Sequence, residues 1–387
     1  MVVLCDGKIE LPALTTAHSH AFQRGMRGKA QRRGPADADD FWSWREAMYS
    51  LAESLTPESM YDLATVAYRE LFARGVRTVG EFHYVHHQAD GTPYDDRTVL
   101  SNAVIRAARD TGLRIALLRV VYHRAGAGRA PEGAQRRFSD PSLDSVFLDI
   151  DDLARQHADD DKVRIGIAPH SVRAVPPDWL PHIARFAEER AMMVHMHLAE
   201  QPAEIEACLD ETRRRPIELV AQRGLLTERF VAVHATHLAE HEPSLLGASN
   251  CFACICPTTE RDLGDGLPPI GPLLAAGVRL CMGVDSHVLS NPIEDMRSVE
   301  LGERLRTLRR VTIQPDRGTL AEALWKMGSS EGAAACGFGD DGATISLRRD
   351  APELQLVADE ELLDAIVFSG TTSLFEPERA AGVLLSL

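Results

Sequence analysis

Short runs of apolar and β-branched residues alternate along the chain with longer segments in which apolar residues recur at helical spacing. Runs of this length, bounded by polar or turn-forming residues, are typical of buried strands. Eight of them are predicted as strands, at Leu14–His20, Val76–His86, Arg114–His123, Val163–Arg173, Met193–Glu200, Phe230–His237, Cys251–Glu260 and Val278–His287. Helices are predicted between most of these strands, including Pro57–Arg74, Leu100–Thr111, Asp178–Arg190 and Pro216–Arg223.

This alternation predicts an α/β protein with a (β/α)8 barrel, the TIM-barrel architecture, over residues 13–336. A doubly wound sheet is the alternative, but no glycine-rich phosphate loop follows the first strand. Residues 1–12 and 337–387 are predicted to form a small, reduced β-rich appendage, with strands at Ala343–Leu347 and Leu354–Val357. The segment Gly28–Asp40, rich in Arg, Gly, Pro and Asp, is expected to be an exposed loop.

Charge and composition narrow the class of ligand and the cellular location. A net charge of −15 over 387 residues excludes a broad basic surface for nucleic acid. A small anion can bind only where local Arg or His side chains overcome that charge. Seven cysteines, scattered and odd in number, indicate reduced thiols in a cytoplasmic protein. We expect no signal peptide, because the N-terminus lacks its features, and no membrane helix, because no apolar run reaches about 18 residues.

The closest grouping of cysteines is Cys251, Cys254 and Cys256. It lacks the second paired cluster that a zinc finger requires. Cysteine on a buried strand behaves as a small hydrophobic residue, so this group is predicted to belong to the core.

Ionisable residues gather at the ends of the predicted strands, where a barrel of this kind builds its active site. His18 and His20 end the first strand, and side chains two apart on a strand share a face. One histidine at a strand end is more often structural, but the coincidence of several strand ends favours a metal site. Zinc prefers nitrogen and oxygen ligands and leaves one position for water in catalytic sites. The predicted ligands are His18, His20, His197 and Asp285.

Two further residues are candidates for proton transfer. A bound divalent metal lowers the pKa of its water from about 15.7 to about 7, which makes the water a nucleophile at neutral pH. Glu200 follows the ligand His197 by three residues and is predicted to accept the water proton and pass it to a leaving nitrogen. His234, at the end of the sixth strand, is predicted to polarise the water or to shuttle the proton. A ligand or purely structural role for His234 remains the alternative.

The paired histidines, the fifth-strand and sixth-strand histidines and the eighth-strand aspartate resemble the amidohydrolase superfamily. Longer strings between residues 10 and 310 are similar to its formimidoylglutamate deiminase family. The most specific are Phe41-Trp-Ser-Trp-Arg-Glu-Ala-Met-Tyr49, Glu81-Phe-His-Tyr-Val-His-His87 and His170-Ser-Val-Arg173. Supporting strings are His18-Ser-His-Ala-Phe-Gln-Arg24, His197-Leu-Ala-Glu-Gln201, His234-Ala-Thr-His237, Leu263-Gly-Asp-Gly266 and Asp285-Ser-His287.

The resemblance implies zinc-dependent hydrolysis of N-formimino-L-glutamate to N-formyl-L-glutamate and ammonia, a step of histidine degradation. It implies one zinc ion per chain, although iron suits similar ligands. The sequence agrees, because Pro169–Arg173 stands where two-metal members carry a bridging lysine. His170 and Arg173 would bind substrate carboxylates, and an arginine fork matches a carboxylate in two-point contact. The resemblance adds Gln23, Arg45 and Tyr84 as substrate-binding residues, whereas none of His83, His86 and His87 is assigned to metal.

Two alternatives stay open. One is another deaminase or ring hydrolase of the superfamily, acting on a purine, pyrimidine or imidazolone, and the other is a metal-binding protein without turnover. The resemblance also suggests a homodimer with a small anionic substrate and no nucleic-acid or membrane partner. The chain departs from the family at both ends, where the expected strands before His18 are mostly missing and those after Gly370 are short.

Overall fold

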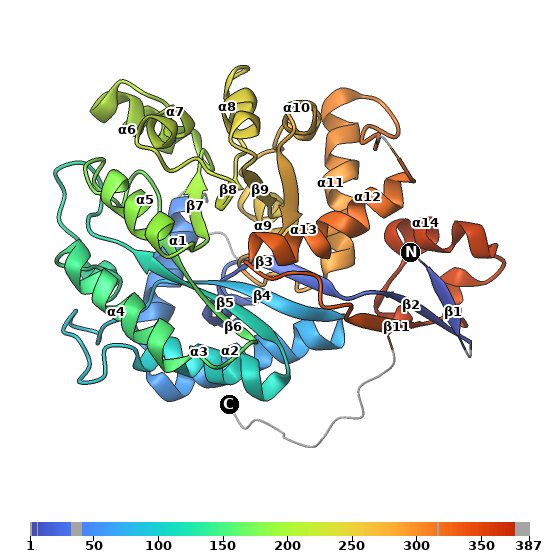
Figure 1. The fold of residues 1–387 in the computed structure, drawn as a ribbon, viewed down its shortest axis with the longest axis horizontal. Helices are drawn as coiled ribbons and strands as arrows, with labels where there is room; N and C mark the ends of the chain where they lie inside the picture. Colours follow the sequence, from blue (N-terminus) through green and yellow to red (C-terminus); the bar gives the residue numbers. More distant parts are fainter. Residues whose placement is uncertain (1, 6, 32–40, 316, 376–387) are drawn as a thin grey trace.

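The computed structural model describes residues 2–5, 7–31, 41–315 and 317–375, and its centre is an eight-stranded parallel sheet (Figure 1). The strands lie side by side in chain order: β3 (Leu14–Ser19), β4 (Val76–His83), β5 (Arg114–Val121), β6 (Val163–Pro169), β7 (Val194–Leu198), β8 (Phe230–His234), β9 (Phe252–Ile255) and β10 (Arg279–Met282). Just beyond the ends of β3 and β10, Ser19 pairs with Asp285, and the His20 N–H donates to the Asp285 carbonyl at 2.9 Å. These contacts close the sheet, so the predicted barrel is confirmed.

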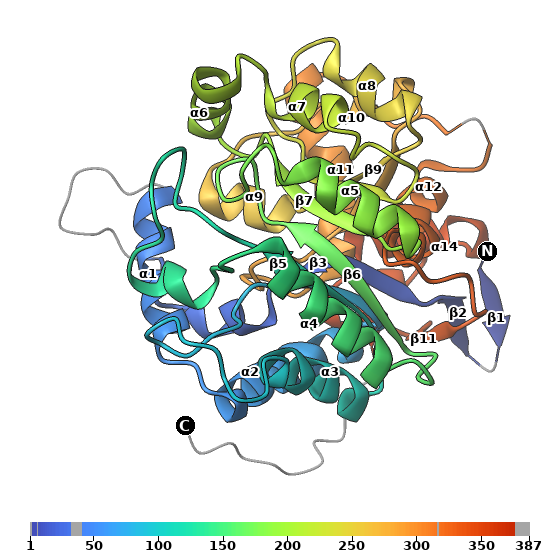
Figure 2. The same cartoon turned by 60° about the vertical axis from the view of Figure 1, so that its left-hand side comes forward.

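Helices lie outside the strands around the barrel (Figures 1 and 2). They are α1 (Phe41–Glu53), α2 (Pro57–Ala73), α3 (Val99–Thr111), α4 (Leu143–Gln156), α5 (Leu180–Glu189), α6 (Pro202–Thr212), α7 (Pro216–Gln222), α8 (Glu242–Ala248), α9 (Pro257–Leu263), α10 (Ile270–Ala275), α11 (Pro292–Thr307), α12 (Leu320–Met327) and α13 (Ser330–Ala335). The α2 boundaries follow from local chemistry. The Thr56 hydroxyl accepts from the Ser59 N–H at 3.2 Å, and Gly75, with φ of +81°, turns the chain into β4. The four predicted helices are confirmed, with boundaries that move by no more than two residues.

The predicted strands were too long at their C-terminal ends. The fourth was predicted to reach Arg173, but β6 ends at Pro169. Pairing stops because the chain turns over the barrel mouth. Ala199 and Asp285 adopt φ of +53° and His234 adopts φ of +71°, and a regular strand does not contain such angles. The strand-like pattern continues past these residues, but their backbone conformation ends the sheet.

The two ends of the described chain meet in a three-stranded antiparallel sheet of β1 (Val3–Cys5), β2 (Lys8–Pro12) and β11 (Thr344–Arg348). The predicted strand Ala343–Leu347 is therefore confirmed within one residue. The predicted strand Leu354–Val357 is wrong, because Pro352–Leu354 forms a short 3-10 helix, and α14 (Leu362–Ser369) follows. Leu356, with φ of +64°, adopts a backbone conformation that a regular strand does not contain. Residues 376–387 and most of the predicted loop Gly28–Asp40 lie outside the described residues.

Helix α13 closes the bottom of the barrel, opposite the mouth. Ala333, Ala335 and Phe338 pack with buried cysteines and with the lower residues of the strands. The His195 Nε2 atom lies 2.8 Å from the Ala335 carbonyl, so this buried imidazole has a hydrogen-bond partner at the bottom of the barrel. The floor is therefore packed, and the polar groups collect at the mouth. Within the described chain, no helix is both long and apolar enough to cross a membrane.

Candidate active site

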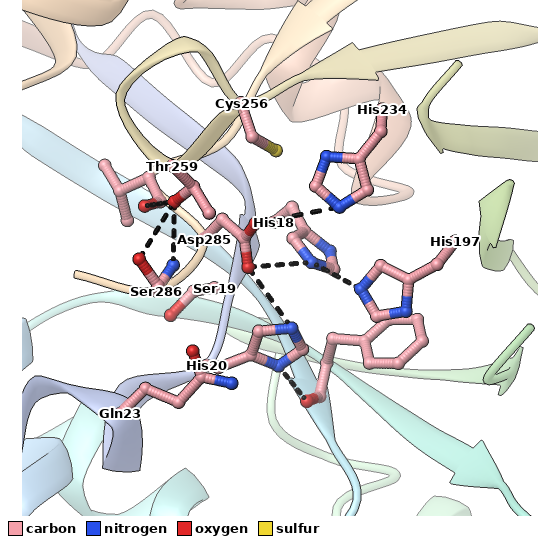
Figure 3. Close-up of polar contacts among 12 residues, drawn as sticks. His18, Ser19, His20, Gln23, His197, His234, Cys256, Thr259, Asp285 and Ser286 are labelled. Atoms are coloured by element: carbon pink, nitrogen blue, oxygen red, sulfur yellow. Dashed lines mark hydrogen bonds and ion pairs between the residues drawn. The ribbon is translucent and has the colours of Figure 1, made fainter. Parts of the chain in front are cut away.

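The four predicted metal ligands converge at the mouth of the barrel (Figure 3). The Nε2 atoms of His18 and His197 lie 3.1 Å apart. The Asp285 Oδ1 atom lies 3.5 Å from the Nε2 of His18 and 3.3 Å from that of His20. Ligand atoms about 2.1 Å from one tetrahedral ion lie about 3.4 Å from one another. These three distances are close to the spacing of ligands on one ion, and ligand atoms of His18, His20 and His197 all lie within 4.8 Å of one another.

Contacts on the far side of two rings fix their protonation. The His20 Nδ1 atom lies 2.9 Å from the Phe82 carbonyl, and the His197 Nδ1 atom lies 3.1 Å from the His170 carbonyl. A carbonyl can only accept, so each Nδ1 carries the proton and each Nε2 keeps its lone pair. Burial lowers the pKa of His18 to about 3 and lowers the pKa values of His20 and His197. The three imidazoles are neutral, which is the form that binds metal.

The fourth donor is an ionised carboxylate. Burial alone would raise the pKa of Asp285, but the imidazoles of His18, His20 and His234 outweigh burial and lower it. Gly283 brings this strand against the first one, because a Cβ at Gly283 would lie only 2.6 Å from the Cβ of His18. Three neutral nitrogens and one carboxylate oxygen are the donor set of a mononuclear zinc or iron site. The residues present fit such an ion.

Glu200 and His234 lie together beside this cluster. The His234 Nε2 atom lies 3.7 Å from Glu200 Oε1 and 3.7 Å from Asp285 Oδ2. Burial would lower the pKa of His234, but Glu200, Glu260 and Asp285 outweigh it and raise that pKa to about 10. Burial raises the pKa of Glu200 above its ordinary value. A buried acid and a buried imidazole with pKa values shifted in this way can hold and exchange one proton.

A pocket opens above the cluster. All the predicted substrate residues line it: Gln23, Arg45, Tyr84, His170 and Arg173. Gln23 Nε2 donates to the Tyr84 hydroxyl at 2.8 Å. The Arg173 Nη2 atom lies 3.9 Å from Glu200 Oε2, so the predicted carboxylate-binding residue reaches the predicted proton carrier. His20, His197 and Asp285 form part of the same lining.

Sequence reasoning missed two tyrosines on the pocket wall. Gln135 Nε2 donates to the hydroxyls of Tyr49 and Tyr122, at 3.1 and 3.0 Å. Each phenol oxygen accepts from the same amide, and the two phenols also hydrogen-bond to each other. The sequence contains a signal for each of these tyrosines. Tyr122 directly follows β5, at a strand end, and Tyr49 belongs to the family-like segment Phe41–Tyr49 that contains the tryptophans.

Arg124 was also missed, although it lines the pocket. Its guanidinium donates to the carbonyls of Val172 and Arg173, at 3.0 and 3.1 Å, and to both carboxylate oxygens of Glu211 on α6. The side chain therefore holds the backbone of the segment that carries Arg173. Its sequence signal is weak, because it lies three residues after the end of β5.

Glu260 is a further functional residue that sequence reasoning missed. Its Oε1 atom lies 3.3 Å from His234 Nδ1 and accepts from the Cys256 N–H at 2.9 Å. Glu260 was predicted to lie on the strand Cys251–Glu260, where it had no evident partner. In the structure the chain leaves the sheet after Ile255, and Glu260 lies in α9. The prediction that Cys251, Cys254 and Cys256 are core residues is confirmed by their burial.

The three histidines that were left unassigned form a separate buried group behind the pocket. The His86 Nε2 atom lies 3.2 Å from the Val120 carbonyl, and the His87 Nε2 atom lies 4.0 Å from Asp140. Burial lowers the pKa values of both rings, and of His83 to about 3. Arg119 bridges Asp140 and a second buried aspartate in the same layer. These rings are therefore neutral groups of a polar structural network.

The chain is similar in sequence and in fold to known proteins. The family model described as Amidohydrolase family matches residues 9–352. Formimidoylglutamate deiminase of Pseudomonas aeruginosa is 35% identical over 373 residues, which cover 94% of this chain and 82% of that protein. An amidohydrolase from Brucella melitensis of known crystal structure is 32% identical, with a TM-score of 0.87 over 95% of this chain and 87% of the other. An adenosine deaminase from Xanthomonas campestris, crystallised with bound zinc, shares the fold at 21% identity, with a TM-score of 0.79 over 95% and 78% of the two chains.

Proposed function

Because the chain belongs to the amidohydrolase family, we propose that it catalyses the hydrolytic deimination of N-formimino-L-glutamate to N-formyl-L-glutamate and ammonia. The relative from Pseudomonas aeruginosa, a formimidoylglutamate deiminase, supports this substrate. The reaction adds water across a carbon–nitrogen double bond. It then breaks a carbon–nitrogen single bond, so that the imino nitrogen leaves as ammonia.

One observation carries the choice of substrate: a single pocket is lined both by the predicted metal ligands and by arginines. His20, His197 and Asp285 are among the lining residues, and Arg45 and Arg173 lie on the walls. N-formimino-L-glutamate has the matching polarity, with a formimino carbon at one end and two carboxylates at the other. The chain has a net charge of −15, so the positive charge that Arg45 and Arg173 bring to one pocket differs from the average surface and favours an anionic substrate.

We assign the metal site to His18, His20, His197 and Asp285, with one zinc ion per chain. The zinc in the adenosine deaminase relative supports a metal of this kind in the fold. A divalent ion held there would supply Lewis acidity to the reacting water and the formimino group. The fit of the donor set and its spacing support the assignment.

The chain's own residues then perform the remaining steps. Arg173 and Arg45 bind the two carboxylates and hold the formimino carbon towards the histidine cluster. Glu200 takes one proton from the attacking water as the carbon–oxygen bond forms and the second from the resulting hydroxyl as the carbonyl forms, and delivers both to the imino nitrogen, which leaves as ammonia when the carbon–nitrogen bond breaks. The Nε2 atom of His234 faces Glu200 at 3.7 Å and stabilises the carboxylate between these transfers. Glu260 accepts from Nδ1 of His234 and so keeps Nε2 directed at the reacting groups.

The principal alternative remains a deaminase of a heterocyclic base. The pocket contains aromatic residues, Tyr49, Tyr84, Tyr122 and Phe138, on which a ring could rest. However, Arg45 and Arg173 on the same walls match the carboxylates of N-formimino-L-glutamate, which a neutral heterocyclic base lacks. A metal-binding protein without turnover is the less favoured alternative, because such a protein does not need Glu200.

Ammonia release decides between these functions. Purified, metal-loaded protein is incubated with N-formimino-L-glutamate and with a panel of cyclic amidines, including adenosine and imidazolone compounds. We expect release from N-formimino-L-glutamate, with kcat/KM at least a hundredfold above that of any ring substrate. Preference for a ring would replace the proposal with the heterocycle function, and no release from any compound would favour metal binding without turnover.

The remaining expectations follow from the same proposal. We propose that residues 13–336 form the catalytic unit and that residues 1–12 and 337–387 form the appendage. A cytoplasmic homodimer with a small anionic substrate stays a prediction. Size-exclusion chromatography with light scattering measures its oligomeric state.

A further inference from the structure

A second group of possible metal ligands lies directly behind the catalytic histidine. His234 Nδ1, Cys256 Sγ and a carboxylate oxygen of Glu260 all lie within 4.8 Å of one another, and all three residues are buried. Figure 3 shows the Cys256 sulfur directed towards the imidazole of His234. Nitrogen, thiolate sulfur and carboxylate oxygen are each ordinary zinc ligands. The three residues come from the end of β8, the residue before α9 and the first turn of α9.

We propose that His234, Cys256 and Glu260 form a second, inhibitory site for a zinc or cadmium ion. This site is distinct from the catalytic one, because it uses Nδ1 of His234, whereas Nε2 faces Glu200 and Asp285. The Nδ1 to Glu260 Oε1 distance is already 3.3 Å, close to the spacing of two ligands on one ion. A sulfur in the same shell would lie about 3.6 Å from the nitrogen, so Cys256 has to approach by about 1 Å.

The surroundings of Cys256 favour a cation. Glu260 and Asp285 lie near the thiol and are buried, so water screens them weakly. Asp295, in the same layer, accepts from the Thr258 hydroxyl at 2.8 Å, but burial raises its pKa, so it adds little negative charge. A second ion adjacent to Glu260 would take the place of the protons that His234 and Cys256 carry there.

A groove on the outer side of the barrel lies next to the site. Ile255, Pro257 and Glu260 line it, between α9 and α11 and separate from the substrate pocket. Glu260 therefore stands between the groove and His234. Because Glu260 is buried, an ion that enters from this side has to displace its side chain.

Occupation of this site should stop proton transfer, a consequence that rests on the proposed function. When the ion binds Nδ1, His234 releases its Nδ1 proton and Cys256 releases its thiol proton, both to solvent, and the remaining ring proton stays on Nε2. The ring then loses the positive charge with which it stabilises the Glu200 carboxylate between the proton transfers. Glu260 would be held by the ion and could no longer orient the ring through its hydrogen bond.

Cadmium titration tests the proposal. Protein carrying one zinc ion per chain is titrated with Cd²⁺ while the thiolate-to-cadmium charge-transfer absorption and the turnover are both recorded. The predicted catalytic ligands include no cysteine, so this absorption reports a cysteine-containing site and not the catalytic one. We expect one further equivalent of cadmium to bind, the absorption to saturate, and turnover to fall at least tenfold in parallel.

Two variants separate the site from its surroundings. Cys256→Ser should abolish the absorption and the inhibition while keeping uninhibited turnover, whereas Cys254→Ser, at an equally buried position on β9, should keep both. Absorption that is missing in the parent protein, or that persists in Cys256→Ser, overturns the site. Absorption without loss of turnover overturns the inhibitory role. If N-formimino-L-glutamate proves not to be the substrate, the absorption titration still decides whether the site exists.

Discussion

Arg124 and Glu211 form a two-point ion pair, with nitrogen–oxygen distances of 2.6 and 2.8 Å, that joins the loop after β5 to helix α6. The same guanidinium donates hydrogen bonds to the backbone carbonyls of Val172 and Arg173. Helix α6 begins two residues after Glu200. The pair therefore connects the predicted carboxylate-binding segment to the helix that follows the predicted proton carrier.

Arg124 and Glu211 should act on substrate binding as one unit. We expect Arg124→Met and Glu211→Gln each to raise KM about tenfold, and the double variant to raise it little further, because contacting residues are not additive. Steady-state kinetics on the four proteins measures the coupling. Arg190→Met, which breaks the surface pair with Asp151, is the control and should leave KM unchanged. Additive effects of the two changes would show that they act independently.

The metal site should stabilise the folded protein. We expect about one tightly bound divalent ion per chain at low free metal, and loss of that ion in His197→Ala. Free metal at about a thousandfold above its dissociation constant stabilises by about 4 kcal/mol, so chelation should lower the melting temperature by several degrees. Elemental analysis and calorimetry measure both effects. His241→Ala, at an exposed histidine, should behave like the parent, and two tightly bound ions would contradict the assignment.

Glu200 should matter for turnover and not for metal content. Glutamine keeps the size of the side chain but cannot carry the proton, so Glu200→Gln should lower kcat by at least about a hundredfold with metal retained. Turnover and elemental analysis of the same preparation test this. Glu206→Gln, on the exposed side of α6, provides the matched control. Near-normal kcat in a fully loaded Glu200→Gln protein would remove Glu200 from the mechanism.

Arg173 should determine preference for a charged substrate. Loss of a charge-assisted hydrogen bond costs about 1.5–3 kcal/mol, or roughly one to two powers of ten in affinity. Arg173→Met should therefore raise KM strongly for N-formimino-L-glutamate. The change should matter less for a formimino compound lacking the carboxylate that Arg173 binds.

The ratio between the two substrates is the decisive quantity, because Arg173 also lies 3.9 Å from Glu200 and could change kcat for both. Arg164→Met, near the opposite end of β6, should leave the ratio unchanged. Equal losses for the charged and the truncated substrate would show that Arg173 does not bind a carboxylate.

Glu81 should make stability depend on pH. Burial raises its pKa to about 7, despite hydrogen bonds from Ser19, Ala21 and Tyr68. The folded state therefore keeps a proton that the unfolded state has lost, so stability falls as pH rises from about 4.5 to about 7 and then levels. The fall is on the order of 2–3 kcal/mol. Thermal unfolding across this range should show a smaller fall in Glu81→Gln than in the parent or in the exposed control Glu360→Gln. Parallel curves for all three proteins would contradict this account.

The barrel and most of the site could be predicted from the sequence, because both depend on local pattern. The spacing of apolar residues along the chain indicates each strand and helix, and parallel strands bring their C-terminal ends to one mouth of the barrel. His18, His20, His197 and Asp285 could therefore be grouped from strand position alone. The resemblance supplied Gln23, Arg45 and Tyr84, which periodicity could not have singled out.

Tertiary structure decided what depends on exact backbone direction and on contacts between distant segments. Positive φ angles at Ala199 and His234 end two strands earlier than their residue pattern does. Residue pattern does not specify that Arg124 holds the backbone of Arg173, or that Cys256 turns its sulfur towards His234. The partner of a side chain depends on the distances between strands in the folded barrel, and the order of residues along the chain does not specify those distances.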